Sequence, residues 1–154
     1  MPESFKTRLM RWGFNLFPAF RGSGGRITYI ASDFGEVRVR VPLNLWTRNY
    51  VGTIYGGSMY GAVDPIYMVM LIHRLGPGYI VWDKAAGIRF LKPGRQTLQA
   101  TFRLDEAELA AIRALAASAS SLDRQYTVEL VDAEGTVCAL IEKTLYIKQK
   151  QPEA

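Results

Sequence analysis

The sequence predicts an α+β fold in which a curved antiparallel sheet wraps around one long central helix. Two observations support this prediction. Six strand-like segments come in three consecutive pairs, which favours antiparallel pairing through hairpins. Between the first and second pairs, Gly57 to Leu75 is apolar nearly all round, as a helix is when neighbours cover every side. A two-layer α+β sandwich is the alternative architecture.

The amino-terminal segment, Ser4 to Phe17, has the pattern of a helix with a basic side and a large apolar side. Its apolar residues recur at three- and four-residue spacing: Phe5, Leu9, Trp12 and Leu16. Pro18 ends the helix, and a glycine-rich loop follows Arg21. Such a helix either packs on the sheet, the more common arrangement, or lies on a membrane. Residues 1–22 are therefore expected to form a helical extension of a single domain that covers residues 1–154.

The strands follow from alternation of apolar and polar residues, clearest where Val37, Val39 and Val41 alternate with arginines. A helix from Asp105 to about Ala117 opens with a capping pattern, and the tail 148–154 is expected to fray. We expect strands at Arg26–Ser32, Glu36–Val41, Ile80–Leu91, Thr97–Leu104, Gln125–Val131 and Thr136–Ile147, with turns at 33–35, 92–95 and 132–135.

The central helix has two possible starting points. If it begins at Gly57, glycine backbone N–H groups at the helix start can polarise a carbonyl oxygen, and Asp64 lies two turns further as a candidate base or nucleophile. If it begins at Asp64-Pro65, Asp64 is an N-cap and residues 56–61 are loop. A proline inside a longer helix would remove the bond to the Gly61 carbonyl and kink the helix.

Composition sets limits on the class of protein. The 154 residues are 49% hydrophobic and 21% charged, with a net charge of +5, which is ordinary for a globular domain with a preference for anionic partners. Basic residues are interspersed with acidic ones, so nucleic-acid binding is not expected. The longest apolar run, Ile66 to Ile72, is too short to span a membrane. With no signal-peptide pattern and one cysteine, Cys138, we expect a cytoplasmic protein without disulfides or stable membrane insertion.

Metal and triad chemistry are not supported by the residue inventory. His73, the one histidine, lies nine residues beyond Asp64 and so on the opposite side of a continuous helix. We expect it to pack at the helix end or lie on the surface. No zinc, Ser-His-Asp or Cys-His site is predicted.

Other charged residues allow two interpretations each. Asp83 lies inside an apolar strand, either as a site residue or in a structural role, which would be an edge position or a solvent-facing pair with Lys84. Arg89, Lys92 and Arg95 flank one turn, where they either hold phosphate groups or are solvated turn residues.

Several separated motifs resemble one superfamily, the hotdog-fold thioesterases of the phenylacetate-pathway type. Asn49-x-x-Gly52-Thr53-x-Tyr55-Gly56-Gly57 followed by Asp64 resembles their active-site segment, and the wider pattern is more similar to an uncharacterised bacterial family of that superfamily. The wider pattern includes 56–65, Val81-Trp82-Asp83-Lys84-Ala85-Ala86, Arg89-Phe90-Leu91-Lys92-Pro93-Gly94 and Glu142-Lys143-Thr144-Leu145-Tyr146. Together these motifs cover residues 25 to 148.

The resemblance implies a hotdog homodimer, or a dimer of dimers, that hydrolyses acyl-CoA or a related acyl-carrier thioester at a site between subunits. It implies Asp64 as base or nucleophile, Gly57 as the N–H donor to the thioester carbonyl, and Gly56 as a substrate-binding residue beside it. Asn49 would orient water or substrate, and Asp83 is a second polar site residue. CoA enters only as part of the substrate, so no cofactor is expected.

One departure from the superfamily pattern bears on activity. Tyr55 stands where the pattern has histidine, and a tyrosine donates a hydrogen bond but is a poor base at neutral pH. An acyl-CoA or acyl-lipid binding protein without catalysis is therefore the alternative function. A hotdog dehydratase is a weaker third possibility, because it needs a histidine at the site.

Overall fold

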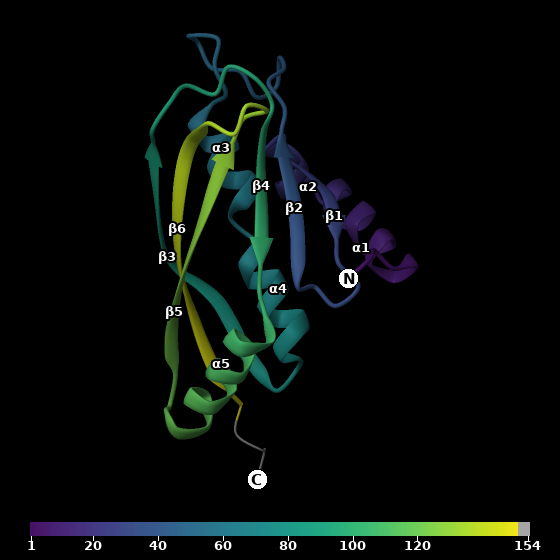
Figure 1. The fold of residues 1–154 in the computed structure, drawn as a ribbon, viewed down its shortest axis with the longest axis vertical. Helices are drawn as coiled ribbons and strands as arrows, with labels where there is room; N and C mark the ends of the chain where they lie inside the picture. The colour runs from purple at the N-terminus through teal and green to yellow at the C-terminus, as the bar shows by residue number, and fades with distance from the viewer. Residues whose placement is uncertain (151–154) are drawn as a thin grey trace.

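One six-stranded antiparallel sheet organises residues 1–150, the part of the chain that this computed structural model describes. The sheet curves around a pair of consecutive helices, as the sequence predicts (Figure 1). The strands, in the order β1-β2-β4-β5-β6-β3 across the sheet, are β1 Arg26–Ile30, β2 Glu36–Val41, β4 Leu98–Arg103, β5 Leu122–Val131, β6 Val137–Gln149 and β3 Tyr79–Phe90. The helices are α1 Phe5–Leu16, α2 Pro18–Gly22, α3 Gly56–Val63, α4 Ile66–Leu75 and α5 Glu106–Ser118.

The central helix is two helices, α3 and α4, separated at Asp64 and Pro65. The helix begins at Gly56, so the alternative that treats 56–61 as loop is wrong, and Asp64 makes no side-chain cap for α4. Pro65 has no N–H to donate to the Gly61 carbonyl, and the continuous helix expected from Gly57 to Leu75 is interrupted there.

Apolar side chains of α3 and α4 form the centre of the core. Met70 and Leu71 are fully buried, and Tyr67 stacks on Tyr126 and meets Phe102 edge-on. The inward positions of the strands complete the core with Val37, Val39, Val41, Leu98, Ala100, Phe102, Val128, Leu130, Ile141, Leu145 and Ile147. The alternation seen in the sequence is therefore the alternation of the sheet's two faces.

The predicted hairpin between Ile80–Leu91 and Thr97–Leu104 is wrong. β3 pairs with β6 along its whole length, and the segment after it arches over the end of the sheet to reach β4 (Figure 1). The segment is held by bonds from Leu91 N and Lys92 N to the Cys138 carbonyl, and from Ile54 N to the Gly94 carbonyl. A Pro-Gly pair between two strands is equally compatible with a hairpin or with a longer connection. The longer connection forms here because β3 pairs with β6.

The other two predicted hairpins are present. β1 pairs with β2, and β5 with β6. Lys148 and Gln149, predicted to fray, extend β6 opposite Ile80 and Tyr79. Lys150, also in the predicted tail, donates its N–H to the Gly78 carbonyl, and residues 151–154 lie outside the described residues.

The amino-terminal helices lie beside β1 at one side of the molecule (Figure 1). Ser4 and Thr7 form a capping box at the start of α1, and the Asn15 side chain bonds both the N–H and the carbonyl of Ile27. The helix is therefore attached to the sheet, as expected. Pro18 ends α1 and begins α2 at the first helical position, where a proline costs no hydrogen bond.

Burial of α4 predicts a contrast between two neighbouring residues. We expect Leu71→Ala to lower the free energy of unfolding by about 2–5 kcal/mol, because it leaves a cavity at a fully buried position. Ile72→Ala, at a position that is 44% exposed, should cost less than about 1 kcal/mol. Urea denaturation of both variants checks this, and equal losses would contradict an enclosed central helix.

Candidate functional site

A buried lysine on β6 organises the candidate site. Lys143 points inward from the same face of the strand as Ile141 and Leu145, and it is only 1% exposed. A cation at such a position is costly unless anions and hydrogen bonds compensate it. The charged side chains around Lys143 therefore mark a candidate functional site.

Two aspartates from different elements meet at Lys143. The Nζ atom lies 2.5 Å from Asp64 Oδ1 and 2.8 Å from Asp83 Oδ1. The contact with Asp64 is a hydrogen bond. The contact with Asp83 is an ion pair whose angles do not meet hydrogen-bond geometry. The Tyr60 hydroxyl, one helical turn before Asp64, donates a second hydrogen bond to Asp64 Oδ1 at 2.6 Å.

The charges of this cluster shift the proton affinities of its members. Burial lowers the pKa of Lys143, but its contacts with Asp64 and Asp83 outweigh burial and leave that pKa raised, so the ammonium form is favoured. Burial raises the pKa of Asp83, and the nearby Asp64 adds to the effect while Lys143 opposes it. Burial and the bond to Asp64 raise the pKa of the Tyr60 hydroxyl, which remains a proton donor.

Asp64 is aimed at Lys143 by the break between α3 and α4. It caps the end of α3, where its N–H still donates to the Tyr60 carbonyl. Both of its side-chain donors fall on Oδ1, and no protein donor among residues 1–150 reaches Oδ2. Because the side chain is 39% exposed, Oδ2 is open to water or a substrate.

Asp83 reaches Lys143 from β3, the strand at the edge of the sheet. The register of β3 against β6 shifts between Asp83 and Ala85, so Lys84 is the extra residue of a bulge. Lys84 pairs with Asp123, and the predicted alternative of an Asp83–Lys84 pair is wrong. Asp83 does lie on an edge strand, one of the alternatives that the sequence leaves open.

A second group of predicted residues gathers at the start of α3. Among residues 1–150, the N–H groups of Gly56 and Gly57 have no protein acceptor, as is normal in a first helical turn. A Cβ atom on Gly57 would lie 2.3 Å from the ring of Tyr55, and one on Gly56 would lie 2.7 Å from the ring of Phe90. Tyr55 itself is 60% exposed and lies over the helix start.

An open groove of about 430 Å³ lies beside these glycines, lined by Gly56, Asn49, Phe90 and Lys92 among others. Asn49 contributes to its wall, but its polar atoms are used within the loop. Its Oδ1 accepts from Val51 N and Thr53 N, and its amide donates to Thr53 Oγ1. Asn49 thus holds the loop that precedes α3.

Asp64 and Gly57 share one face of α3 but do not meet within one chain. They are seven residues apart, which at 1.5 Å per residue is roughly 10 Å along the axis. A single carbonyl group needs its donor and its attacking group within about 3–3.5 Å. One chain alone therefore does not bring these two groups to the same reacting atom.

The remaining predicted residues lie apart from the lysine cluster. Arg89 forms a solvent-exposed pair with Glu142 at 3.7 Å, and Lys92 and Arg95 are exposed near the groove. His73 stacks on Phe34, with ring centroids 4.1 Å apart, and its pKa is lowered by burial first and by Lys6 second. Cys138 is buried and free, and no cluster of metal-binding side chains occurs within residues 1–150.

Lys143 and Tyr60 are the site residues that sequence reasoning missed. A signal for Lys143 was available, because a lysine interrupts the apolar alternation Ile141, Leu145, Ile147 of the last strand. For Tyr60 the signal is its position four residues before Asp64, on the same helical face.

The chain belongs to the family described as "Domain of unknown function (DUF4442)", whose model matches residues 6–147. Its fold is that of proteins described as thioesterases. A Pseudomonas aeruginosa protein of unknown function, described as a probable thioesterase, has a TM-score of 0.82 at 22% identity, over 97% of this chain and 99% of that one. A thioesterase from Haemophilus influenzae has a TM-score of 0.69 at 14% identity, over 98% and 97%.

A Chlorobaculum tepidum protein of unknown function has a TM-score of 0.73 at 16% identity, over 94% of this chain and 95% of that one. At these identities the likeness shows the hotdog fold and no more. The sequence matches no curated protein. Within residues 1–150, none of the helices has the length and apolar character that crossing a bilayer requires.

Removal of Lys143 should destabilise the fold in a pH-dependent way. We expect Lys143→Met to lower the free energy of unfolding at pH 7 by about 3 kcal/mol, the lower end for a broken buried pair, because both aspartates are partly solvated. Asp83, without its cation, would have its pKa raised further above its unfolded value of about 3.9. The loss should therefore shrink as the pH falls towards 4 and grow as the pH rises through the raised pKa.

Urea denaturation across the pH range measures this, with Lys84→Met as the matched control. Lys84 forms an exposed pair with Asp123, so its removal should cost less than about 1 kcal/mol at every pH. A Lys143→Met variant as stable as Lys84→Met would contradict the buried cluster.

Proposed function

We propose that this chain hydrolyses acyl thioesters of the acyl-CoA type at a site completed by two copies of the chain. The observation that carries the proposal is Asp64, a carboxylate held through Oδ1 by Lys143 and Tyr60 while Oδ2 remains open. Anchoring one oxygen fixes the direction of the other, as a positioned base or nucleophile requires. The fold shared with proteins described as thioesterases supports the same reaction class.

The reaction needs water and no cofactor. Asp64 Oδ2 accepts a proton from a water molecule whose oxygen attacks the thioester carbonyl carbon. The tetrahedral intermediate then collapses with breakage of the C–S bond, and the proton passes to the leaving sulfur, giving a carboxylic acid and a thiol. Alternatively, Asp64 attacks the carbonyl itself and the C–S bond breaks to release the thiolate. Water then hydrolyses the resulting anhydride, which gives the carboxylic acid, regenerates Asp64 and supplies the proton that the thiolate takes up.

The oxygen of the thioester would be stabilised at the start of α3. The amide of Gly57, next to that of Gly56, lies where the helix dipole favours negative charge and has no protein acceptor. Tyr55, which lies over Gly57, would add a hydrogen bond from its hydroxyl rather than act as a base.

A second copy would bring the two halves together. β3 is an edge strand with exposed apolar side chains, among them Trp82 at 52% and Phe90 at 58%, and an open edge of this kind invites pairing. Pairing β3 with its copy makes a two-fold interface that includes the strand carrying Asp83. Asp64 of one chain would then face Gly57 of the other, which removes the separation of roughly 10 Å within one chain.

The nucleotide end of CoA would lie near the groove beside α3. Lys92 lines that groove, and Arg95 is exposed close by. Arg89 is paired only with an exposed glutamate at 3.7 Å, a weak contact that a phosphate can replace. Asn49 would act by holding the loop that forms the groove wall.

Acyl-thioester binding without hydrolysis is the second candidate function. Two observations favour it: Tyr55 replaces a histidine of the superfamily pattern, and the charge of Asp64 is already paired with Lys143. Release of free thiol from a panel of acyl-CoAs, followed with a thiol-trapping reagent, distinguishes the two functions.

Loss of the Asp64 carboxylate should remove turnover without removing the fold. We expect Asp64→Asn to lower kcat by about 10²–10⁴-fold, the usual contribution of a general base, because an amide cannot take the proton. The control is Asp123→Asn, an exposed carboxylate on β5 that should leave kcat unchanged. Turnover by Asp64→Asn equal to that of Asp123→Asn would refute the role of Asp64.

Mixed copies test the shared site. Asp64→Asn and Gly57→Val chains should each be inactive alone and should regain part of the activity when refolded together, because one hybrid site has both groups intact. Sedimentation velocity checks that each variant still associates. Absence of rescue from variants that fold and associate would count against a site built from two chains.

A further inference from the structure

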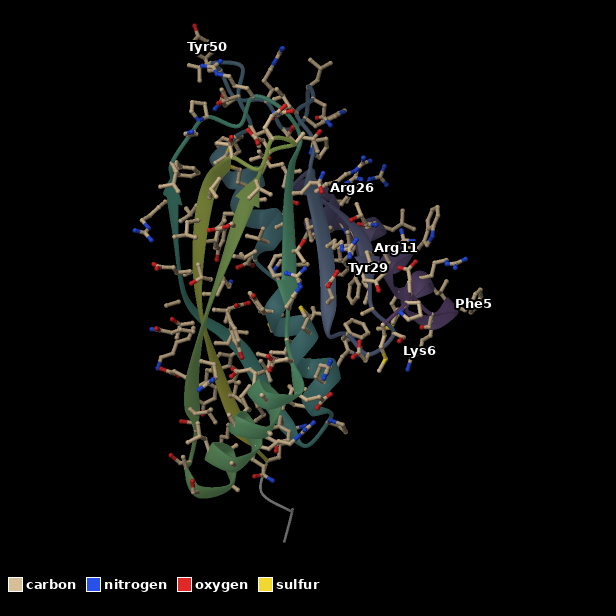
Figure 2. The ribbon with its side chains drawn as sticks, in the orientation of Figure 1. Phe5, Lys6, Arg11, Arg26, Tyr29 and Tyr50 are labelled. Atoms are coloured by element: carbon tan, nitrogen blue, oxygen red, sulfur yellow. The ribbon has the colours of Figure 1, made fainter. Side chains whose placement is uncertain are left out.

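The amino-terminal helix α1 presents its apolar face to solvent. The side packed on β1 carries the buried Thr7 and the Asn15 amide that bonds Ile27. The opposite side is a stripe that we call the outer face of α1: Phe5 is 80% exposed, Leu9 64%, Trp12 60% and Leu16 61%. Figure 2 shows Phe5 projecting from the helix, away from the sheet.

The spacing makes this face continuous. At about 100° per residue, its four side chains fall within roughly 60° of one another around the helix. Phe17, which follows directly and is 62% exposed, extends it. Large contiguous apolar patches on a protein surface mark places where something else binds.

Basic side chains border the outer face on both sides. Arg8 lies on one flank, where it is 58% exposed and only loosely paired with Glu3 at 3.7 Å, and Lys6 lies exposed on the other. α1 has no acidic residue, and the nearby Glu3 turns inward with its side chain 15% exposed, paired with Arg11 at 2.7 Å. Arg11 lowers the pKa of Glu3, so this acid stays ionised within its ion pair and offers little negative charge to a ligand.

The apolar stripe and its basic borders indicate which kind of partner binds the outer face of α1. An apolar stripe with tryptophan and phenylalanine, flanked by lysine and arginine, suits the interface of an anionic membrane. A second copy docked face to face would bring the flanking cations of two helices together without acids to neutralise them, which costs binding free energy. Charge complementarity therefore favours an anionic lipid surface.

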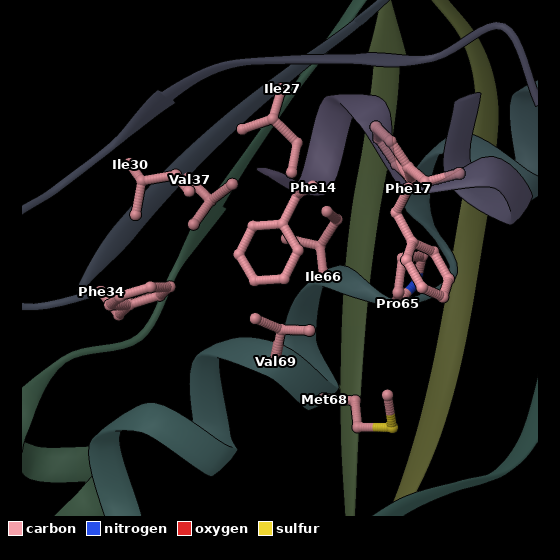
Figure 3. A pocket seen from close by; sticks show the side chains of 11 residues that line it. Phe14, Phe17, Ile27, Ile30, Phe34, Val37, Pro65, Ile66, Met68 and Val69 are labelled. Atoms are coloured by element: carbon pink, nitrogen blue, oxygen red, sulfur yellow. The ribbon is translucent and has the colours of Figure 1, made fainter. Parts of the chain in front are cut away.

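An apolar cavity beneath the helix also favours lipid. It has a volume of about 250 Å³, and every side chain that lines it is apolar (Figure 3). Phe17 belongs to both the outer face and the cavity wall, and Phe14 lines the cavity from the inner side of α1. An apolar cavity of about 150 Å³ already binds benzene, so this one has room for part of an aliphatic chain.

We propose that α1 is a peripheral docking helix that places this protein on an anionic lipid surface, with its outer face in the headgroup and acyl boundary. Lys6 and Arg8 contact lipid phosphates, and Trp12 lies at the interface. The helix lies on the membrane and does not cross it. The proposal does not depend on thioester hydrolysis.

Vesicle co-sedimentation of the full chain tests the proposal. The probes are vesicles of phosphatidylcholine and phosphatidylglycerol in equal parts, compared with phosphatidylcholine alone. We expect the chain to bind the anionic vesicles more tightly, and Leu9→Ser with Trp12→Ser to weaken binding by roughly tenfold or more. The matched control is Leu45→Ser with Trp46→Ser, an exposed leucine and tryptophan in a loop away from α1, which should bind as wild type.

Three further variants separate the contribution of charge from that of the proposed hydrolysis. Lys6→Gln and Arg8→Gln should each weaken binding to the anionic vesicles by roughly fivefold, as expected for one cation near an anionic surface. Asp64→Asn should bind like wild type, so failure of the proposed hydrolysis leaves this test intact. All substituted residues of α1 are exposed, and unchanged thermal unfolding would show that the variants fold.

Three outcomes would overturn the proposal. One is failure of the wild type to bind anionic vesicles. Another is equal binding to neutral vesicles. The third is equal binding to anionic vesicles by the double variant in α1 and the double variant in the control loop. If vesicles do not bind and sedimentation velocity shows that Leu9→Ser with Trp12→Ser dissociates an oligomer, the occupant of the outer face is a second copy.

Discussion

The burial of α3 and α4 is the constraint on which the rest of the molecule depends. A helix pair that is apolar nearly all round needs cover on every side, and a single flat sheet covers only one. The sheet must therefore curve, and its six strands must be ordered so that both ends of the curve reach the helices. On the side that the sheet leaves open, the amino-terminal helices beside β1 provide the cover, and an apolar cavity lies between them and the start of α4.

The same enclosure explains the charged cluster. Pro65 interrupts the helix pair, and the interruption leaves Asp64 at the end of α3 with its side chain turned to the sheet. Lys143 meets it from β6, and Asp83 reaches the same lysine from β3, so three elements converge on one ammonium group. A buried lysine with two aspartates is an expensive way to stabilise a fold, since an apolar side chain would serve as well. The cluster is better understood as an arrangement that holds the Asp64 carboxylate in one orientation.

The amino-terminal helix shows that amphipathicity does not by itself say which side packs. The expectation for a helix such as α1 is that its apolar stripe faces the sheet. Here the inner side is anchored instead by Thr7, the Asn15 amide and a few partly buried side chains, whereas the larger apolar stripe faces outwards. The sheet edge at β1 offers backbone groups that only a polar side chain can satisfy, and Asn15 satisfies the N–H and carbonyl of Ile27 at once.

Local patterns in the sequence determined much of this protein. Alternation located the strands, turn residues located two of the three hairpins, and the apolar run located the central helix, because each signal depends on neighbours within a few residues. For the glycines before Asp64 and for Asp83, residue type and spacing left two interpretations open, and the motif resemblance favoured the site role. Tertiary structure alone decided that β5 and β6 lie between β3 and β4, that Lys143 is a partner of Asp64 across 79 positions, and that α1 turns its apolar side outwards. Pairing partners, long-range ion pairs and the facing of a helix depend on competition between distant segments for the same contacts, and no local pattern contains the outcome of that competition.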